Sequence, residues 1–470
     1  MMTGHPLADR IAGRVIEPGD DGYHAARTVW NGMIDRKPAV IVACTSTGDV
    51  VAALRFARDA ELEIGIRCGG HSIAGLAVPD RGLMLDLSPM NAVRVDPDRR
   101  RAWVEGGALL GVLDEAAQRN GLVTTAGNVS HTGVGGLTLG GGMGWLARQL
   151  GLTCDNVASY EMVTADGTVL RANDCENADL YWGLRGGGGN FGVVTRFAFH
   201  LHALDTRALS VELYFPLDEA EAPLRRWRDL LGEAPRQATL TAWVGTAGDW
   251  PHLPLALRGQ PMANVGYVWV GDPDEGRKFL PALRGGFTPA AQIIDELTYL
   301  DLQRRDDSPQ GHSYRRYWKG HYIREFNDGA VRQFLARESS GFAPSASLQA
   351  YGGAIADVPD DESAFSQRDA LVELVVAARW SDPAEDADRM SAARRYAALL
   401  QPYASGAYVN TLSDEGQHGI RRAYPPNKLA RLTALKDHYD PHNIFHLNQN
   451  IRPTGWHPAR PAPVPSRSVA

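Results

Sequence analysis

The chain has 470 residues, of which 44% are hydrophobic and 22% charged, a balance typical of a globular protein with room for two or more domains. Its formal net charge of -7 argues against nucleic acid or an anionic membrane as a general partner. No apolar stretch reaches the roughly 18 residues of a membrane span, and no secretory signal is visible at the start, so we expect a cytoplasmic protein. The four cysteines contain no CxxC pair, which argues against a disulfide framework and a cysteine-rich metal site.

Residues 38–70 have the strand–helix–strand order of a βαβ unit. The apolar run 39–43 predicts a buried strand, and Thr47 or Asp49 can cap the helix that follows it. A second strand over 62–66 carries apolar residues at alternate positions and stops at two glycines. The second strand therefore delivers Arg67 and the glycines after it.

The first candidate binding motif is the segment Arg67-Cys68-Gly69-Gly70-His71-Ser72. Two adjacent glycines let the backbone approach a flat or charged ligand closely, because no Cβ is in the way. They present His71 at a turn against that ligand. Taken alone, the motif also fits a surface or capping histidine, and the rest of the chain must decide.

Between residues 83 and 121 the sequence predicts three more strands and a helix. Residues 83–87 form an apolar strand, and 92–95 and 101–104 flank the turn Asp96-Pro97-Asp98 as a hairpin. The helix expected over 108–120 ends at Gly121, which suits a left-handed terminator.

A second glycine cluster occupies residues 130–145, SHTGVGGLTLGGGMGW. Its backbone N–H groups suit phosphate oxygens. A dinucleotide-binding GxGxxG fingerprint fits poorly, because no clean βαβ unit with a suitably placed acidic residue surrounds it. A flexible linker also fits poorly, because Leu137, Met143 and Trp145 are apolar side chains that favour burial. A buried glycine-rich wall against a large cofactor is the better interpretation.

A third glycine run, RGGGGNFG at residues 185–192, follows a predicted hairpin at 160–170 and a short helix near Trp182. It leads directly into an alternating strand at 197–201. Three such clusters within about 125 residues are explained most economically by one extended ligand.

Together these motifs resemble the FAD-binding half of the vanillyl-alcohol oxidase (PCMH-type) flavoproteins. The matching segments are RxGGHS, TGVGGLTLGGGMGW, LTCDN, VTADG and RGGGGNFGVVT. More narrowly, the chain is similar over nearly its whole length to the berberine-bridge-enzyme-like branch, near bacterial hydroxynicotine oxidases and natural-product tailoring oxidases. The resemblance implies an α+β fold, with a PCMH-type FAD-binding domain and a second, substrate domain of antiparallel sheet backed by helices.

In that family the histidine of RxGGH is bonded to the 8α-methyl group of the flavin, so the resemblance makes His71 the covalent FAD anchor. Some members add a cysteinyl link, but Val129 stands at that position here and cannot form a thioether. A single histidyl bond is therefore expected, and Cys68 and Cys154 are interpreted as small packing residues near the cofactor. The positions matched to the family's cofactor-binding motifs are Arg67, Cys68, Gly69, Gly70, Ser72, Thr132, Gly133, Gly135, Gly136, Leu137, Gly142, Gly144, Trp145, Asn156, Gly192, Val194 and Asn448.

Residues 205–414 change character to long strands alternating with helical patterns. Strands are expected at 210–215, 239–244, 265–270, 345–351 and 371–378, and helices at 219–231 and 384–400. The resemblance implies that the inner face of this sheet covers the flavin. Pocket candidates are Tyr299, Tyr317, Trp318, Gln349 and Tyr351, although aromatic residues on strands belong to a core more often than to a ligand site.

The segment Ala407-Tyr408-Val409-Asn410 matches the family's YxN strand, whose tyrosine projects over the flavin and can serve as a catalytic base. An unperturbed phenol is only about 0.1% ionised at pH 7, so a basic or hydrogen-bonding neighbour would have to lower its pKa. A cross-strand packing tyrosine is the equal alternative for Tyr408. Tyr424, which precedes a turn at Pro425-Pro426, is the second candidate base.

The helix over 428–439 and the segment 440–451 match the family's C-terminal signature, in which Asn448 contacts the flavin. This segment should fold back onto the first domain. We therefore expect an FAD-binding domain at 1–204, a substrate domain at 205–414, a return to the FAD domain at 415–455 and a flexible tail at 456–470.

The implied activity is a two-electron oxidation at a C–H bond next to OH or NH, with hydride transfer to FAD and reoxidation by O2 to H2O2. The substrate is a small molecule or natural product, and the fold does not choose among alcohols, sugars, amines and cyclisations. The alternatives are a flavin-dependent oxygenase or oxidative cyclase of secondary metabolism and, from another class, a non-catalytic flavin-binding protein. A nicotinamide-dependent dehydrogenase would need a Rossmann fingerprint, and none is convincing. The oligomeric state stays open.

Overall fold

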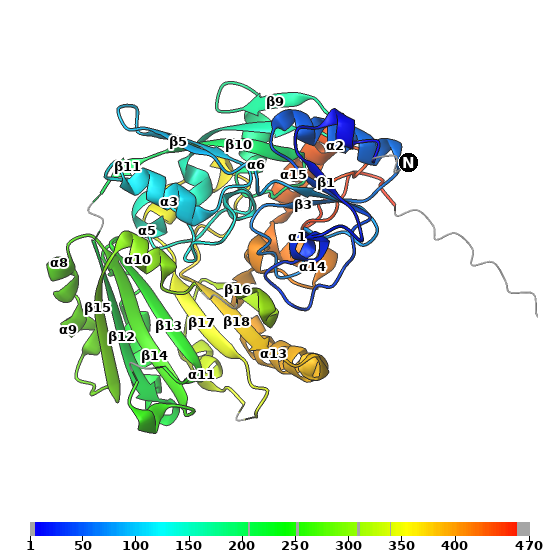
Figure 1. The fold of residues 1–470 in the computed structure, drawn as a ribbon. Helices are drawn as coiled ribbons and strands as arrows, with labels where there is room; N and C mark the ends of the chain where they lie inside the picture. Colours follow the sequence, from blue (N-terminus) through cyan, green and yellow to red (C-terminus); the bar gives the residue numbers. More distant parts are fainter. Residues whose placement is uncertain (1–4, 205–206, 251–252, 308–310, 339, 458–470) are drawn as a thin grey trace, which may run out of the picture.

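The structure is a computed structural model that describes residues 5–204, 207–250, 253–307, 311–338 and 340–457. Within these ranges the chain forms four β-sheets with helices on their faces (Figure 1). From residue 458 onward, the tail expected at 456–470 lies outside the described residues. No helix in the described part is both long and apolar enough to cross a membrane.

The first sheet has four short strands in the order β1-β2-β4-β3. They are β1 (Arg14–Ile16), β2 (Val40–Ala43), β4 (Leu83–Asp86) and β3 (Ile64–Arg67), and the last three run parallel. The expected strand–helix–strand order is present, but β4 lies between the two strands of the unit. The central strands β2 and β4 are largely apolar and buried, as is usual for a parallel sheet, whereas β1 is antiparallel and more exposed.

The helix after β2, α2 (Thr47–Asp59), is capped by Ser46 and not by Thr47 or Asp49, so the expected cap is wrong by a residue. Ser46 has the extended backbone that an N-cap requires, and its Oγ accepts a hydrogen bond from the Asp49 N–H at 3.1 Å. The Asp49 carboxylate instead accepts backbone N–H groups from Ala12, Gly13 and Thr45. Asp49 therefore joins the N-terminal segment to the start of α2.

The second sheet has five antiparallel strands in the order β5-β6-β10-β8-β9. They are β5 (Val93–Asp96), β6 (Arg101–Glu105), β10 (Val193–His200), β8 (Val157–Val163) and β9 (Val169–Ala172). Both expected hairpins are confirmed, because β5 pairs with β6 and β8 with β9. The helix α3 (Leu110–Gln118) is followed by Gly121 at φ +63°, the left-handed conformation expected there.

An eight-stranded antiparallel sheet, at the lower left of Figure 1, has the order β15-β12-β14-β13-β17-β18-β16-β19. In that order its strands are Ala291–Thr298, Arg207–Pro216, Pro261–Val270, Ala238–Thr246, Ser345–Ala350, Val372–Trp380, Arg315–Ile323 and Ala404–Gly406. One face packs against α7 (Glu221–Asp229), α11 (Asp328–Leu335) and α13 (Asp386–Leu400) in an apolar core.

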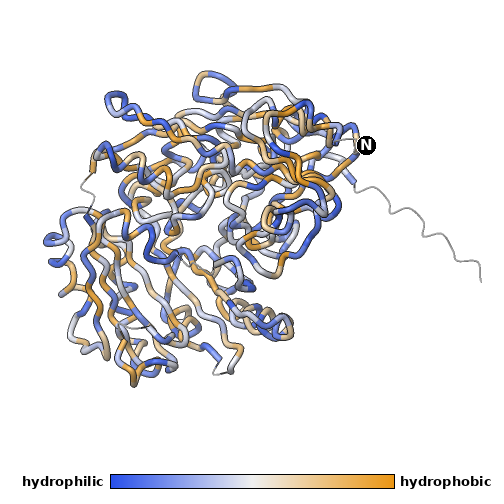
Figure 2. The backbone as a smooth tube through the Cα atoms, in the orientation of Figure 1, coloured by the Kyte–Doolittle hydropathy of each residue, from blue (hydrophilic) through white to orange (hydrophobic). Residues whose placement is uncertain are grey.

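The opposite face of the large sheet is more polar. Thr241, Gln349, Glu373 and Tyr322 are successive cross-strand partners on β13, β17, β18 and β16, so their side chains share this face. Figure 2 shows the mixture of apolar and polar residues along these strands. This face therefore resembles the wall of a site more than a core.

The expected strand at 407–410 is wrong, because β19 ends at Gly406. Tyr408 precedes a turn of 3-10 helix at Val409–Thr411, in which the Thr411 N–H bonds to the Tyr408 carbonyl at 3.1 Å. A helical turn satisfies these backbone groups locally, so the segment leaves the sheet.

The C-terminal helix α15 (Pro426–Tyr439) ends in a fully buried ion pair between Lys436 and Asp440, 2.7 Å apart. The Lys436 Nζ also donates to the carbonyls of Asn190 and Phe445. Asp440 accepts the Phe445 N–H as well. This pair therefore ties the C-terminal segment to the third glycine run.

We expect Asp440→Ala to lower the free energy of unfolding by about 3 kcal/mol, because it leaves the buried Lys436 ammonium without its counter-charge. Urea unfolding measures this loss. The matched control is Asp437→Ala on the same helix, whose bonds to Thr454 lie at the surface; it should change the value by about 0.5 kcal/mol or less. Equal effects of the two variants would contradict the assigned role of the pair.

Candidate active site

The three glycine runs and the C-terminal segment meet in one continuous wall. A Cβ on Gly69 would lie 2.3 Å from the backbone nitrogen of Gly133, so the first and second runs touch backbone to backbone. The Leu139 carbonyl, in the second run, accepts the N–H groups of Gly186 and Gly188 in the third. Asn448 then donates its side-chain amide to the Gly189 carbonyl at 3.0 Å. Segments from four parts of the chain thus form a single surface, which we call the glycine wall.

Some matched glycines are required by packing alone. A Cβ on each would meet backbone or side-chain atoms at less than 3.0 Å, or at 3.0 Å for Gly135. These glycines are Gly69, Gly133, Gly135, Gly142, Gly144 and Gly192. Gly70 has φ +68°, which favours glycine for conformational reasons.

Gly136 and Gly189 differ from these, because a Cβ on either would have no atom within 4 Å. Gly136 lies within the short helix α4 (Val134–Leu139), where glycine is unfavourable relative to alanine. Neither helix propensity nor packing explains glycine at position 136. A ligand lying against the wall would explain it.

The Arg67 guanidinium pairs with Asp86 at 3.1 Å, and its buried Nε has no hydrogen-bond partner among the described residues. The Cys68 thiol donates to the Ala108 carbonyl at 3.5 Å, and burial raises its pKa to about 11. Cys68 is therefore a neutral packing group, whose sulfur lies against Gly133. The hydroxyl of Ser72 accepts the N–H of Leu76 at 3.4 Å.

The His71 imidazole stacks on Trp30, with ring centroids 4.8 Å apart and an angle of 14° between the planes. Its Nε2 lies 2.7 Å from Nδ1 of His131, and its Nδ1 lies 3.3 Å from the hydroxyl of Thr132. Burial, with smaller contributions from His131, His312 and Arg316, lowers the pKa of His71 to about 3. The ring is therefore neutral at physiological pH and keeps a lone pair on one nitrogen.

Tyr408 contacts the glycine wall through its hydroxyl oxygen, which accepts the Gly142 N–H at 2.8 Å and the Asn410 side-chain amide at 2.9 Å. Asn410 also donates to the Leu137 carbonyl. Burial raises the pKa of Tyr408 above its usual range, Glu373 adds to this, and the two hydrogen bonds oppose it. The net direction is upward, so Tyr408 is a neutral phenol in this environment.

Glu373 is a candidate that the sequence reasoning did not single out. Its carboxylate accepts the Tyr351 hydroxyl at 3.2 Å, and the Tyr351 and Tyr322 hydroxyls are 3.1 Å apart. The Tyr322 ring lies 6.3 Å from the Tyr408 ring. Burial raises the pKa of Glu373 to about 7. The available signal was a lone acidic residue inside the apolar strand 372–378.

The other pocket candidates separate onto different surfaces. Gln349 accepts a hydrogen bond from the side-chain amide of Asn128 at 3.0 Å. This bond joins the polar face of the sheet to the segment just before the second glycine run. Trp318 packs edge-on against Trp30. Tyr317 points to the opposite face of β16, where its hydroxyl binds Asp414 and Arg394. Adjacent residues of a strand face opposite sides, so Tyr317 and Trp318 cannot share one pocket.

Five further candidates lie in packed or bonded positions. Trp145 packs with Tyr299 in an apolar cluster, so neither contributes to the polar face. The Asn156 side chain donates to the carbonyls of Leu150 and Leu152 and accepts a bond from His202. Val194 of β10 is buried and lies opposite Met162 of β8. Tyr424 is the second candidate base. Its hydroxyl donates a hydrogen bond to the Gly186 carbonyl, in the third glycine run, at 2.7 Å.

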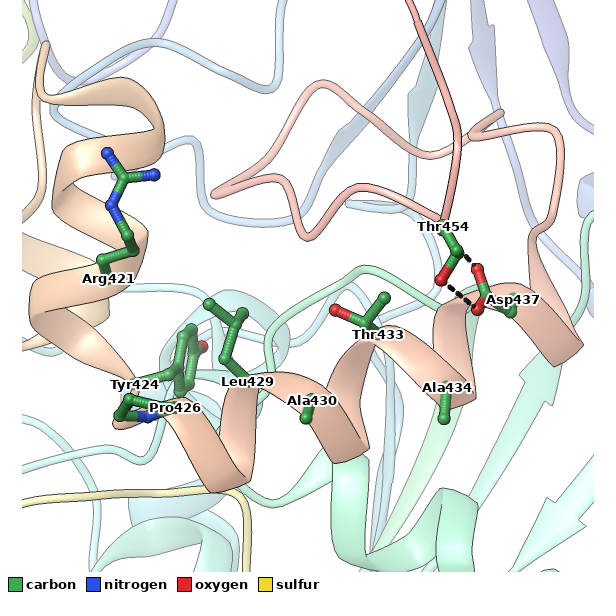
Figure 3. Close-up of a pocket in the computed structure, with 9 residues that line it drawn as sticks. All are labelled: Arg421, Tyr424, Pro426, Leu429, Ala430, Thr433, Ala434, Asp437 and Thr454. Carbon is green, nitrogen blue, oxygen red and sulfur yellow. Dashed lines mark hydrogen bonds between the residues drawn. The ribbon is translucent and has the colours of Figure 1, made fainter.

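A cavity of about 520 Å³ lies between α14 (Gly416–Ala423) and α15 (Figure 3). It is lined by Arg421, Tyr424, Pro426, Leu429, Ala430, Thr433, Ala434, Asp437 and Thr454. Asp437 is hydrogen-bonded to Thr454, and the rest of the lining is largely apolar. This cavity lacks the groups that gather around Tyr408. Across the described ranges, no cluster of three or more His, Cys, Asp or Glu residues could hold a metal ion.

The wall fits an extended cofactor with polar and flat parts. Gly136 and Gly189 leave room beside the backbone, and the buried Oδ1 atoms of Asn448 and Asn450 have no partner among the described residues. Unpaired buried acceptors are costly unless a ligand donates to them. The family model described as an FAD binding domain matches residues 38–173, and that described as berberine and berberine like matches 407–452.

The chain is 31% identical to (R)-6-hydroxynicotine oxidase of Paenarthrobacter nicotinovorans, over 95% of this chain and 98% of that protein. The chain belongs to the berberine-bridge-enzyme-like FAD-linked oxidoreductases. An FAD-linked oxidoreductase of Dictyostelium discoideum is 32% identical over 95% of this chain and 96% of its own. The expected family is therefore confirmed, and the protein is an oxidoreductase with an FAD-binding domain.

Solved structures confirm the α+β, PCMH-type fold. The crystal structure of 6-hydroxy-D-nicotine oxidase from Arthrobacter nicotinovorans superposes with a TM-score of 0.85 at 29% identity, covering 95% of this chain and 99% of that one. Xylooligosaccharide oxidase from Myceliophthora thermophila has a TM-score of 0.83 at 22% identity, covering 96% and 99%. The second likeness concerns the fold alone.

We expect Gly136→Ala to weaken FAD binding about tenfold without destabilising the protein, because the added methyl fills space on the ligand side and alanine favours the helix. FAD titration of flavin-free protein, followed by flavin fluorescence, measures the affinity. Gly69→Ala is the contrast, since its methyl meets the Gly133 backbone and should lower the melting temperature. Unchanged FAD affinity in Gly136→Ala would show that Gly136 does not face the cofactor.

Glu373 gives a pH prediction with a definite sign. Its folded-state pKa of about 7 exceeds the ordinary value of 4.5, so the folded protein binds more protons between these values. The contribution of Glu373 to stability should therefore fall as pH rises from about 4.5 to 7 and then level off. Glu373→Gln removes this contribution and so changes the pH profile of stability, whereas Glu219→Gln at the surface keeps the wild-type profile. Melting temperatures across pH 5–8 test this, and parallel curves for wild type and Glu373→Gln would contradict it.

Proposed function

We propose that the protein is an FAD-dependent oxidase that oxidises a small molecule or natural product at a C–H bond next to an OH or NH group. The observation that carries the proposal is the position of Tyr408, bonded to the glycine wall at Gly142 and close to the Tyr322–Tyr351–Glu373 network. The similarity to a protein named (R)-6-hydroxynicotine oxidase supports an oxidase and a small-molecule substrate.

His71 would hold FAD through a single histidyl bond, and Val129 leaves no second covalent link. Four further residues would contact the cofactor. Arg67 and Asn448 each have a buried polar atom without a partner among the described residues. Thr132 has its hydroxyl beside His71, and Gly136 leaves open space next to its backbone. When bound, FAD supplies a two-electron acceptor that O2 can reoxidise with release of H2O2. The domain limits proposed for this arrangement are 1–204, 205–414 and 415–455.

Tyr408 contacts the substrate's O–H or N–H group in this proposal. Its oxygen already accepts two hydrogen bonds, which hold the ring in place and stabilise charge on the oxygen when its proton leaves. Glu373 is the final proton acceptor, because a carboxyl with a pKa of about 7 can take up and release a proton near neutral pH. Tyr351 and Tyr322 connect Glu373 towards Tyr408.

We expect Tyr408→Phe to slow substrate-dependent bleaching of the flavin about 100-fold while leaving FAD content unchanged. Anaerobic stopped-flow absorbance on a substrate found by peroxide release measures this rate. Tyr424→Phe is the matched control and should retain the wild-type rate, because that hydroxyl is bonded to Gly186. If Tyr408→Phe bleaches as fast as wild type, Tyr408 is not the base.

Peroxide yield separates the alternatives. Release of one H2O2 per substrate molecule oxidised supports an oxidase. Incorporation of an oxygen atom from O2 into the product would instead identify an oxygenase. Failure of every substrate class to bleach the flavin would favour a non-catalytic flavin-binding protein.

A further inference from the structure

A chain of polar groups leads away from His71 across the interface between the glycine wall and the large sheet. Nε2 of His71 lies 2.7 Å from Nδ1 of His131, and Nε2 of His131 lies 3.9 Å from a carboxylate oxygen of Asp307. Ser130 donates both its N–H, at 3.0 Å, and its hydroxyl to the same carboxylate. His131 is therefore held between the predicted FAD anchor and an acidic group.

Asp307 is held in place by the helix that precedes it, α10 (Tyr299–Arg304). Gln303 of this helix donates to the Gly127 carbonyl at 2.8 Å and to the Asp114 carboxyl at 3.0 Å, and both partners lie on the FAD-binding side. The neighbouring Arg304 pairs with Glu115. These contacts join α10 to residues 114–127 and position the Asp307 carboxylate beside His131.

We propose that His131 and Asp307 act as a proton-accepting pair that promotes covalent attachment of FAD to His71. This inference rests on the histidyl link of the proposed function and adds the residues that would form it. Neither residue belongs to the matched cofactor motifs, and neither is used in the oxidation described above.

The proposal needs one of the tautomers that the contact between His71 and His131 permits. If His71 carries its proton on Nε2 and donates it to Nδ1 of His131, the lone pair of His71 is on Nδ1. His131 then carries its own proton on Nε2, the nitrogen that faces Asp307. Trp30 stacks on His71 and holds the ring at one orientation. In this tautomer His71 Nδ1 is the nucleophilic atom, and burial keeps both imidazoles neutral by lowering their pKa values.

The attachment step balances with O2 as the oxidant. A bond forms between His71 Nδ1 and the 8α-carbon, while one C–H bond of the methyl group and the Nε2–H bond of His71 break. The Nε2 proton passes to His131, and the resulting imidazolium is stabilised by the Asp307 carboxylate. The methyl hydrogen leaves as a proton, its electron pair reduces the flavin ring, and O2 reoxidises the ring and becomes H2O2.

The test follows acid-stable flavin over time, a readout that does not depend on turnover. Full-length protein produced under riboflavin starvation is mixed with FAD in air, and samples are precipitated with acid at intervals. Flavin absorbance of the pellet gives the attachment rate, and mass spectrometry identifies the peptide with His71. His131→Gln is the central variant, because glutamine can accept a hydrogen bond but cannot take a proton.

We expect attachment to slow about 100-fold in His131→Gln and about tenfold in Asp307→Asn, with reversible FAD affinity within about twofold of wild type. Added imidazole should restore part of the rate in His131→Ala. The matched control is His312→Ala: this exposed histidine lies 6.1 Å from the His131 ring and should leave the rate unchanged.

Wild-type attachment rates in His131→Gln would overturn the proposal, and so would a loss of attachment that merely parallels a loss of FAD affinity. If wild-type FAD is released entirely by acid while the protein still oxidises substrate, the histidyl link and the pair fail, but the oxidase stands. If FAD is acid-stable and no substrate reduces it, the oxidase fails alone.

Discussion

The close approach of two backbones at Gly69 and Gly133 is the constraint on which the site depends. The two backbones are so close that a Cβ on either glycine would collide with the backbone nitrogen of the other. This contact fixes the first glycine loop against the second and thereby sets His71 beside Thr132 and His131. Glycine is usually discussed as a source of flexibility, but here its absence of a side chain produces a rigid junction.

The large sheet contributes through the alternation of its strands. One face forms an apolar core with α7, α11 and α13, and the other presents a row of polar partners that includes Gln349, Glu373 and Tyr322. The same alternation sends Tyr317 to the helical side and Trp318 towards Trp30. A fold with two such faces can change its substrate by changing residues on one face while keeping the core on the other.

Local patterns predicted much of the secondary structure, because a hairpin such as β8–β9 or a helix such as α15 is determined by neighbouring residues. The errors also have local causes: Ser46 competes with Thr47 for the cap, and Tyr408 begins a helical turn after the sheet ends. The family motifs predicted His71 and Asn448. They could not predict Glu373, which acquires its neighbours Tyr351 and Tyr322 only when three strands pair.

The contact between Asn448 and Gly189 has a consequence for how the protein is made. During synthesis the three glycine runs leave the ribosome long before the segment that completes their surface. Until that last segment arrives, the wall lacks Asn448, and the Asn190 carbonyl lacks the Lys436 ammonium that binds it. The glycine wall therefore stays incomplete until the whole large sheet has been translated, so its completion depends on the entire polypeptide.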